Sequence, residues 1–305
     1  MQNELINNNN IKQENDGEIL NNLSSINFLY NNKLNNNQFR MLSEFIYKEL
    51  GIKMPEVKKT MLESRLHKRL KETNNKNFSD YLKYLFSAEG KDKELVHMFD
   101  VITTNKTDFF REPSHFEHIK STIIPEFTLK NKNRILKVWS AGCATGEEPY
   151  TLAMVLNDLV EQNLLFDYSI VASDISTRAL KKAIEAVYPA PRAVEIPLYY
   201  KKKYLLKSKD ITNPTIRIAA MLRNKVNFQR INFMDEHYDI ANNFDLILCR
   251  NVIIYFDRIT QEKVINKLCT KLKPDGFFFL GHSESITNMK VNLEIIKPTI
   301  YRKKQ

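Results

Sequence analysis

The first part of the chain repeats apolar residues every three or four positions. Phe39, Leu42 and Leu50 belong to one such run, and Gly51 stands where a helix C-cap is expected. Further runs with the same period continue to about residue 103. The pattern predicts a small all-helical domain.

From Arg134 the pattern changes to short apolar runs that alternate with helical stretches. The expected strands cover residues 135–139, 169–172, 226–228, 245–249 and 277–280. Strands that alternate with helices predict an α/β domain with a mostly parallel sheet. The last segment, residues 293–302, has no helix before it and is expected to be an antiparallel closing strand.

These patterns divide the 305 residues into three parts, in keeping with about two folded domains of ~150 residues. Residues 1–37 are rich in asparagine and predict a disordered tail. Residues 38–115 form the helical domain with its linker, and residues 116–305 form the α/β domain. Within the latter, residues 188–230 carry early prolines and a lysine run, which predicts a small β insertion.

The charge balance of 46 − 36 = +10 predicts an anionic partner, but charge alone does not choose among nucleic acid, a membrane surface and an acidic protein. Cys143, Cys249 and Cys269 show no C-x-x-C spacing, so neither a cysteine zinc site nor a disulfide framework is expected. No apolar run reaches the ~18 residues of a membrane helix, and the N-terminus lacks signal-peptide features. We expect a cytoplasmic protein without membrane insertion.

The first predicted strand leads into a loop with two of the seven glycines, Gly142 and Gly146. A helix opened by Glu147 and Glu148 follows. A loop of this kind is typical of a nucleotide-type cofactor site, but two carboxylates would repel a pyrophosphate. They suit a cofactor with a cationic end, such as S-adenosylmethionine. The alternative is a helix whose acids only complement its macrodipole.

A second acidic position follows the second predicted strand. Asp174 lies 174 − 146 = 28 residues after Gly146, where a carboxylate can accept both ribose hydroxyls of a nucleoside. Alone, Asp174 could equally be the N-cap of the next helix. Together with the glycine loop, it favours a nucleoside site.

Two further segments carry polar residues beside aromatic ones. After the strand 245–249 come Arg250, Asn251 and Tyr255, which are expected at the same cleft because such sheets bind ligands at strand carboxyl ends. At the junction between the domains, Arg111 could pair with a carboxylate of cofactor or substrate.

The second helix of the first domain is basic. At 100° per residue, Lys58, Arg65 and Arg69 fall within roughly 40° of one another, beside a stripe of leucines. One face can pack while the next binds anions; a merely solvated charged face is the alternative.

With these residues in view, the chain resembles the CheR family, the chemotaxis receptor protein-glutamate O-methyltransferases. The likeness covers about residues 38–302. Its motifs stand in family order: T-x-F-F-R-E from Thr107, W-S-A-x-C-x-T-G-E-E-P-Y from Trp139, S-D-I from Ser173, C-R-N-V-x-I-Y-F from Cys249 and G-H-S-E-S from Gly281.

The resemblance implies a class I S-adenosylmethionine-dependent methyltransferase fold with an N-terminal helical domain and a small β insertion. It implies that Tyr255 lies near the transferred methyl and that the basic helix meets the receptor. The positions that match the family's cofactor contacts are Asn105, Thr107, Arg111, Glu147, Asp174, Asn232, Phe233, Arg250 and Asn251.

The implied reaction transfers a methyl group to glutamate carboxylates of chemoreceptors. We expect Arg111 and Tyr255 at the reacting region, no metal, and a monomer. One departure is that residues 207–218 of the insertion hold no glycine, which speaks against binding of a receptor's C-terminal pentapeptide. A nucleic-acid methyltransferase is the competing function, weakened because no N-P-P-[YF] follows the strand 245–249; a non-catalytic scaffold is a third.

Overall fold

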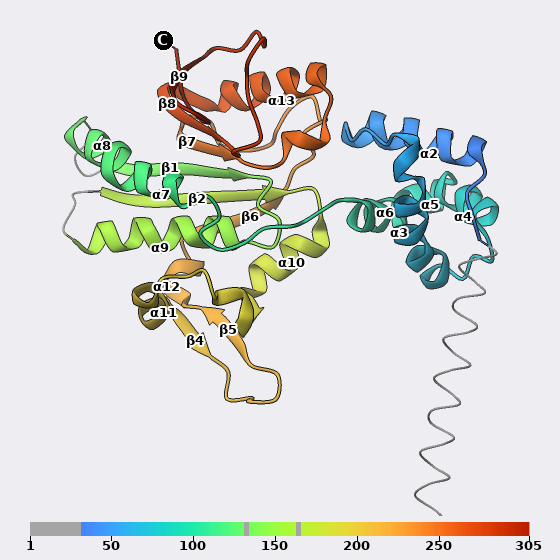
Figure 1. Ribbon diagram of the computed structural model, residues 1–305, viewed down its shortest axis with the longest axis horizontal. Coiled ribbons are helices and arrows are strands. Elements are labelled where there is room, and N and C mark those ends of the chain that lie inside the picture. The colour runs from blue at the N-terminus through green and yellow to red at the C-terminus, as the bar shows by residue number, and fades with distance from the viewer. Residues whose placement is uncertain (1–31, 131–133, 163–165, 305) are drawn as a thin grey trace, which may run out of the picture. The chain divides into compact units, whose positions relative to one another are not determined.

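The computed structural model describes residues 32–130, 134–162 and 166–304 (Figure 1). Residues 1–31 of the predicted tail lie outside the described residues. The prediction of disorder is wrong for the end of that segment, because Leu34 is 2% exposed, its N–H donates to Glu63 Oε1 at 2.9 Å, and the first described helix begins at Asn36.

The chain forms two compact units. We call residues 32–45 and 54–102 the helical unit, and residues 46–53 and 103–304 the larger unit. The sequence pattern groups residues 38–115 as the helical domain and its linker. In the structure, residues 46–53 and 103–115 belong to the larger unit.

The helical unit is built from short amphipathic helices. Leu62, Leu66 and Leu70, which form the predicted stripe, are fully buried in its core. The helix bounds are α2 Asn36–Leu50, whose last turn belongs to the larger unit, the 3-10 turn η1 Glu56–Lys58, α3 Lys59–Glu72, α4 Phe78–Leu85, α5 Ala88–Lys93 and α6 Leu95–Ile102.

The larger unit alternates helices and strands, as predicted. Its helical elements are α7 Pro113–His118, the π-turn η2 Ile119–Ile123, α8 Ile124–Lys130, α9 Glu147–Glu161, α10 Thr177–Glu185, η3 Ala190–Ala193, α11 Leu198–Tyr204, α12 Ala220–Arg223, η4 Ile253–Tyr255 and α13 Arg258–Lys271. Among the described helices, none is long and apolar enough to cross a membrane.

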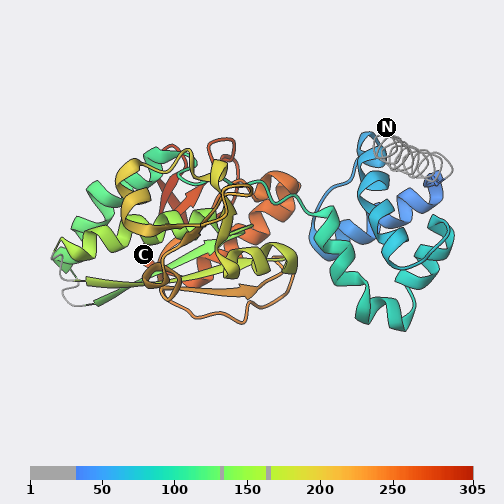
Figure 2. The same cartoon turned by 90° about the horizontal axis from the view of Figure 1, so that it is seen from below.

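The main sheet has the strand order β6-β2-β1-β7-β8-β10-β9. The strands are β1 Arg134–Ala141, β2 Phe166–Asp174, β6 Val226–Arg230, β7 Phe244–Cys249, β8 Leu272–Leu280, β9 Leu293–Lys297 and β10 Ile300–Lys303. The first five pair in parallel, which confirms the predicted strands, and β1 and β2 lie side by side in Figures 1 and 2.

The C-terminal segment differs from its prediction. It forms two antiparallel strands, β9 and β10, and β10 pairs with β8. The turn between them places Thr299 at φ +64°, which interrupts an otherwise continuous strand pattern.

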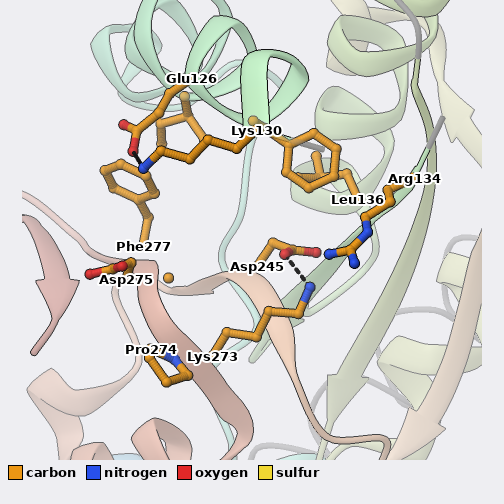
Figure 3. A pocket seen from close by; sticks show the side chains of 12 residues that line it. Glu126, Lys130, Arg134, Leu136, Asp245, Lys273, Pro274, Asp275 and Phe277 are labelled. Atoms are coloured by element: carbon orange, nitrogen blue, oxygen red, sulfur yellow. Dashed lines mark hydrogen bonds and ion pairs between the residues drawn. The ribbon is translucent and has the colours of Figure 1, made fainter. Parts of the chain in front are cut away.

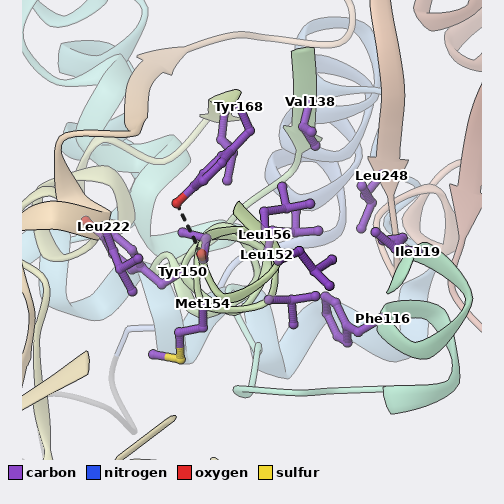
Figure 4. Packing of buried hydrophobic residues seen from close by; sticks show 14 of the residues in the cluster. Phe116, Ile119, Val138, Tyr150, Leu152, Met154, Leu156, Tyr168, Leu222 and Leu248 are labelled. Atoms are coloured by element: carbon purple, nitrogen blue, oxygen red, sulfur yellow. Dashed lines mark hydrogen bonds between the residues drawn. The ribbon is translucent and has the colours of Figure 1, made fainter. Parts of the chain in front are cut away.

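Successive side chains of a strand point to opposite faces of the sheet, so the strands contribute to two hydrophobic cores, one on each face. Val138 and Leu248 face α9 and the helices α7 to α8, a packing that Figure 4 shows around α9. Trp139 and Ile247 face the opposite side, where they pack with residues of α13. The unit is therefore a three-layer sandwich, with the strand ends free to form a binding edge.

The predicted insertion forms a separate three-stranded antiparallel sheet. Its strands are β3 Val187–Pro189, β4 Leu205–Lys207 and β5 Thr215–Ile218, in the order β3-β5-β4. Figure 1 shows this small sheet as a lobe beside α11 and α12, away from the main sheet.

Candidate functional site

The carboxyl ends of β1, β2 and β7 meet at one edge of the main sheet, because these strands are parallel neighbours. The chain reverses its direction of winding between β1 and β7, and ligands bind at such a switch point. Candidate residues from all three strand ends therefore come together here.

The loop after β1 depends on its glycines. Gly142 has φ +89° and donates its N–H to Ser173 O at 2.8 Å, and a Cβ there would lie 2.3 Å from Val252 Cγ2. Gly146 has φ +96°, and a Cβ there would lie 2.9 Å from Ala183 Cβ. Only glycine allows this conformation and this close packing.

Asp174 is the last residue of β2, and its side chain hydrogen-bonds to the same loop. Its side chain is 8% exposed, Oδ2 accepts the N–H of Ala144 at 2.9 Å, and Oδ1 accepts the N–H of Ser176 at 2.9 Å. The N-cap of α10 is Ser176, whose hydroxyl accepts the N–H of Ala179. The alternative that Asp174 itself caps α10 is therefore wrong, and its carboxylate stands fixed at the binding edge.

Glu147 opens α9 and is 1% exposed. Its Oε2 accepts the hydroxyl of Thr145 at 2.6 Å, and its Oε1 accepts Arg192 Nη2 at 2.6 Å. Arg192 comes from η3, beside the small sheet, and also pairs with Asp108 at 3.0 Å. A buried carboxylate of this kind attracts cations, and here one guanidinium already contributes.

Glu148 points elsewhere. Its Oε1 accepts Ser140 Oγ at 2.7 Å, and its Oε2 pairs with Arg250 Nη1 at 3.1 Å. Burial raises the pKa of the Glu148 carboxyl, although Arg250 and the Ser140 hydrogen bond oppose the rise. The two acids at the start of α9 therefore have different partners: Glu148 pairs with Arg250 and Glu147 with Arg192.

Arg250 links three segments of the edge. The 2% exposed side chain pairs with Glu112 Oε2 at 3.0 Å as well as with Glu148, and it donates to the carbonyl of Arg111. Burial alone would raise the pKa of Glu112, but Arg250 and the hydrogen bonds outweigh it, so this pKa lies below its ordinary value. Burial, followed by the charge of Arg250, lowers the pKa of His115 to about 4.

Comparison with known proteins decides the family. Residues 105–302 match the CheR methyltransferase SAM binding domain, and residues 37–103 match the CheR methyltransferase all-alpha domain. The chain belongs to the CheR methyltransferase family. It is 40% identical over 280 residues to a chemotaxis protein methyltransferase of Borreliella burgdorferi, covering 90% of this chain and 97% of that one.

Other relatives agree with this assignment. The chain is 35% identical to chemotaxis protein methyltransferase 2 of Pseudomonas aeruginosa, covering 86% of this chain and 91% of the relative. It is 33% identical to the chemotaxis protein methyltransferase of Salmonella typhimurium, covering 88% and 90%. This CheR protein is an S-adenosylmethionine-dependent protein-glutamate methyltransferase whose substrates are chemoreceptor glutamates.

Asn251 and Tyr255 follow β7 along the chain. Asn251 has φ +59°, and its Nδ2 donates to Glu112 Oε1 at 3.2 Å. Tyr255 is partly exposed at the end of η4, and its carbonyl accepts the N–H of Lys53 at 3.2 Å. Asn251 thus contacts the segment before α7, and the backbone of Tyr255 contacts the segment after α2.

Asn232 and Phe233 follow β6, next to β2 in the sheet. Asn232 Nδ2 donates to Glu49 O at 2.7 Å, so the last turn of α2 is anchored here. Phe233 is 8% exposed and packs against Tyr238, with ring centroids 6.0 Å apart. Phe233 thus contributes mainly to the core on the α13 face.

The segment before α7 contributes mainly its backbone. The carbonyl of Thr107 accepts Arg192, and the 9% exposed side chain of Thr107 is buried. Arg111 is partly exposed, and its Nη1 donates to Lys106 O at 3.3 Å. Asn105 is partly buried. The contact with Arg192 ties the segment to η3, beside the small sheet.

The basic face predicted on α3 is only partly present. Arg69 is 8% exposed, and its Nε and Nη2 bind Glu94 at 2.7 and 2.5 Å, so its place on an exposed anion-binding face is wrong. Arg65 is partly exposed and donates to Ile102 O, and Lys58 is partly exposed. The helical period correctly places Arg69 on the same side of the helix as Arg65. Its guanidinium nevertheless binds the buried Glu94, which directly precedes α6, and is not exposed.

Sequence reasoning missed several residues of this edge. Three of them bind partners that are distant in the sequence: Arg192 pairs with Glu147, Glu112 with Arg250, and Glu284 accepts the N–H of Asn251. A fourth, Tyr188, donates its hydroxyl to Thr145 O at 2.8 Å. Glu112 and Glu284 fall inside quoted CheR motifs, which was the available signal. Arg192 and Tyr188 lie in the insertion, where no pattern marked them.

A pocket of about 270 Å³ lies at the opposite edge of the sheet, where β1, β7 and β8 begin (Figure 3). Lys130, Arg134, Asp245 and Lys273 are among its lining residues, and Lys273 pairs with Asp245 at 2.5 Å. It shares no residue with the predicted cofactor site, so we assign it no part in cofactor binding.

Proposed function

We propose that the edge formed by the ends of β1, β2 and β7 holds S-adenosylmethionine, with Asp174 at the ribose and Glu147 at the ammonium. The observation that carries this proposal is the buried Asp174 carboxylate, which two backbone N–H groups hold beside the glycine loop. The further proposed contacts are Asn105, Thr107, Arg111, Asn232, Phe233, Arg250 and Asn251.

Glu147 fits a cationic group although it already has partners. Its two oxygens together offer about four lone-pair sites, of which Thr145 and Arg192 use one each. About two lone-pair sites therefore remain for a third donor beside Arg192. The resulting hydrogen bonds are charge-assisted and strong.

The reaction needs alignment rather than proton transfer. The bound cofactor supplies a methyl group on a cationic sulfur, and a glutamate with an ordinary pKa of about 4.3 is already ionised at neutral pH. We propose that Arg111 and Tyr255 orient the two reacting groups and exclude water. The absence of any need for a general base explains why the sequence holds no catalytic triad.

For receptor recognition we propose Lys58 and Arg65 of the helical unit as contacts for acidic receptor helices. Both are partly exposed, whereas Arg69 is withdrawn by its buried ion pair. We further propose that the protein acts as a cytoplasmic monomer. The β4–β5 connection, residues 208–214, holds no glycine, which supports the proposal that this insertion does not bind a receptor pentapeptide.

The test combines cofactor binding with methyl transfer. Purified protein is mixed with methyl-labelled S-adenosylmethionine and chemoreceptor-containing membranes, and label released as methanol by mild base identifies glutamate methyl esters. We expect Asp174→Ala to abolish cofactor binding, whereas the exposed control Asp239→Ala leaves it unchanged. Normal cofactor binding by Asp174→Ala would contradict the proposed site.

The docking surface is tested separately. We expect Lys58→Glu with Arg65→Glu to bind the cofactor normally but to methylate receptors more slowly. Reversal of the charge of Lys83, which is exposed on α4, serves as the matched control. Unchanged receptor methylation by the double variant would refute the docking role.

A further inference from the structure

A cluster of possible metal ligands lies beside Arg250 and uses residues outside the predicted cofactor site. Glu112, His115 and His282 each present one ligand atom, and these three atoms lie within 4.8 Å of one another. Glu112 Oε2 is 3.5 Å from His115 Nδ1 and 3.9 Å from His282 Nε2. All three belong to the larger unit.

The hydrogen bonds of His115 are compatible with a metal-binding tautomer of its ring. Thr299 Oγ1 lies 2.6 Å from Pro298 O, to which it can donate, and 2.8 Å from His115 Nε2. In the tautomer with the ring proton on Nε2, that N–H donates to the hydroxyl oxygen and Nδ1 carries a lone pair. Second-shell hydrogen bonds of this kind orient metal-binding histidines.

The Nδ1 atom of His115 is buried and has no hydrogen-bond partner among the residues that the structure describes. It faces Glu112 Oε2, which is also an acceptor. In this tautomer the two atoms, 3.5 Å apart, do not hydrogen-bond to each other. Arg250 pairs with Glu112 Oε2, so the lone pair of the buried His115 Nδ1 is the group that a cation would satisfy.

Arg250 does not supply that charge in full. It pairs with Glu112 Oε2 at 3.0 Å, but it also pairs with Glu148 Oε2 at 3.1 Å, so two carboxylates share one guanidinium. The other oxygen of Glu112 accepts Asn251 Nδ2 and the N–H of His282. With both carboxylates ionised, one negative charge remains for a further cation.

We propose that Glu112, His115 and His282 bind a divalent transition-metal ion, with Zn²⁺ as the representative. Imidazole and carboxylate ligands suit this class of ion, and metal–ligand bonds of about 2.0–2.1 Å in a tetrahedron place ligand atoms about 3.3 Å apart. His282 is 57% exposed, which gives access from solvent and leaves a fourth position for water. The ion joins the start of α7 to the loop after β8.

The test measures metal binding by the full chain, purified without a histidine tag and freed of metal with a chelator. Calorimetric titration with Zn²⁺ and visible absorption with Co²⁺ report stoichiometry and coordination independently of methylation. We expect one site per chain and at least a tenfold loss of affinity in His282→Ala. His237→Ala, an exposed histidine of the same unit, serves as the matched control and keeps the wild-type affinity.

A second variant separates metal binding from damage to the fold. Thr299→Val removes the acceptor of His115 Nε2, and a lost second-shell partner lowers metal affinity roughly 10–100-fold. Thr299→Ser keeps the hydroxyl and restores the affinity. No stoichiometric Zn²⁺ binding by the wild type, or equal binding by His282→Ala, overturns the proposal. Zinc binding that persists in Asp174→Ala shows that this site is independent of the cofactor site.

Discussion

Replacement of Arg250 by methionine tests how the binding edge is held together. The side chain is 2% exposed, and its removal leaves Glu112 and Glu148, which are 10% and 13% exposed, without their shared counter-charge. Loss of one partner of a buried ion pair costs about 3–5 kcal/mol. At about 2–4 °C per kcal/mol for a unit of this size, the melting temperature falls by roughly 6–20 °C.

The loss depends on pH with a defined sign. In the wild type the pKa of Glu112 is lowered, so its stabilising effect is present above its unfolded pKa and disappears as pH falls through the lower folded value. In Arg250→Met, burial is opposed only by the remaining hydrogen bonds of Asn251, His282 and Ser140, so we expect the folded pKa of Glu112 to rise and that of Glu148, already raised in the wild type, to rise further. The deficit of the variant relative to the wild type is then smallest at acid pH and grows as pH rises.

The sequence offers a suitable probe for this experiment. Trp139 is the single tryptophan, is fully buried in the larger unit and donates to Ser173 Oγ at 2.9 Å. Its fluorescence during urea unfolding therefore follows that unit alone. We expect the deficit of Arg250→Met to be larger at about pH 8 than at about pH 5, and Glu148→Gln in the same chain to recover part of it. A pH-independent deficit, or one below about 1 kcal/mol, refutes the reasoning.

Three further predictions follow from single contacts. Glu147→Gln weakens S-adenosylmethionine binding at least tenfold, about 1.4 kcal/mol, as measured by calorimetry, because the charge-assisted contact is lost. Gly142→Ala lowers the melting temperature and the cofactor affinity, since the added Cβ meets Val252 at 2.3 Å in a left-handed conformation. Arg69→Met destabilises the helical unit by about 3–5 kcal/mol in circular-dichroism melts, whereas Lys68→Met, 62% exposed, has no measurable effect.

Local patterns were sufficient to locate the five parallel strands of the main sheet and to place Asp174 at the end of β2. Apolar runs bounded by glycines and acids placed β1 and β2 correctly, and parallel strand ends bring Asp174 to the glycine loop by geometry alone. The C-terminal hairpin escaped prediction because its turn rests on one residue, Thr299, in a conformation unusual for a β-branched side chain.

Long-range pairing explains the errors at charged positions. The helical period correctly grouped Arg69 with Arg65, but the partner Glu94 stands 25 residues away, and no local rule selects it. The same holds for Arg192, whose partner Glu147 is 45 residues distant. Patterns with a short period identify faces of helices and sheets, whereas ion pairs across elements require the fold itself.

The hydroxyl of Tyr188 in β3 contacts the loop before α9, and the guanidinium of Arg192 in the following η3 contacts the first residue of α9. Replacement of this insertion by that of a relative therefore also changes contacts with the start of α9. A donor insertion has to carry a phenol and a guanidinium at these two places. Without them, a chimaera designed to address a new receptor also loses the support of its own glycine loop.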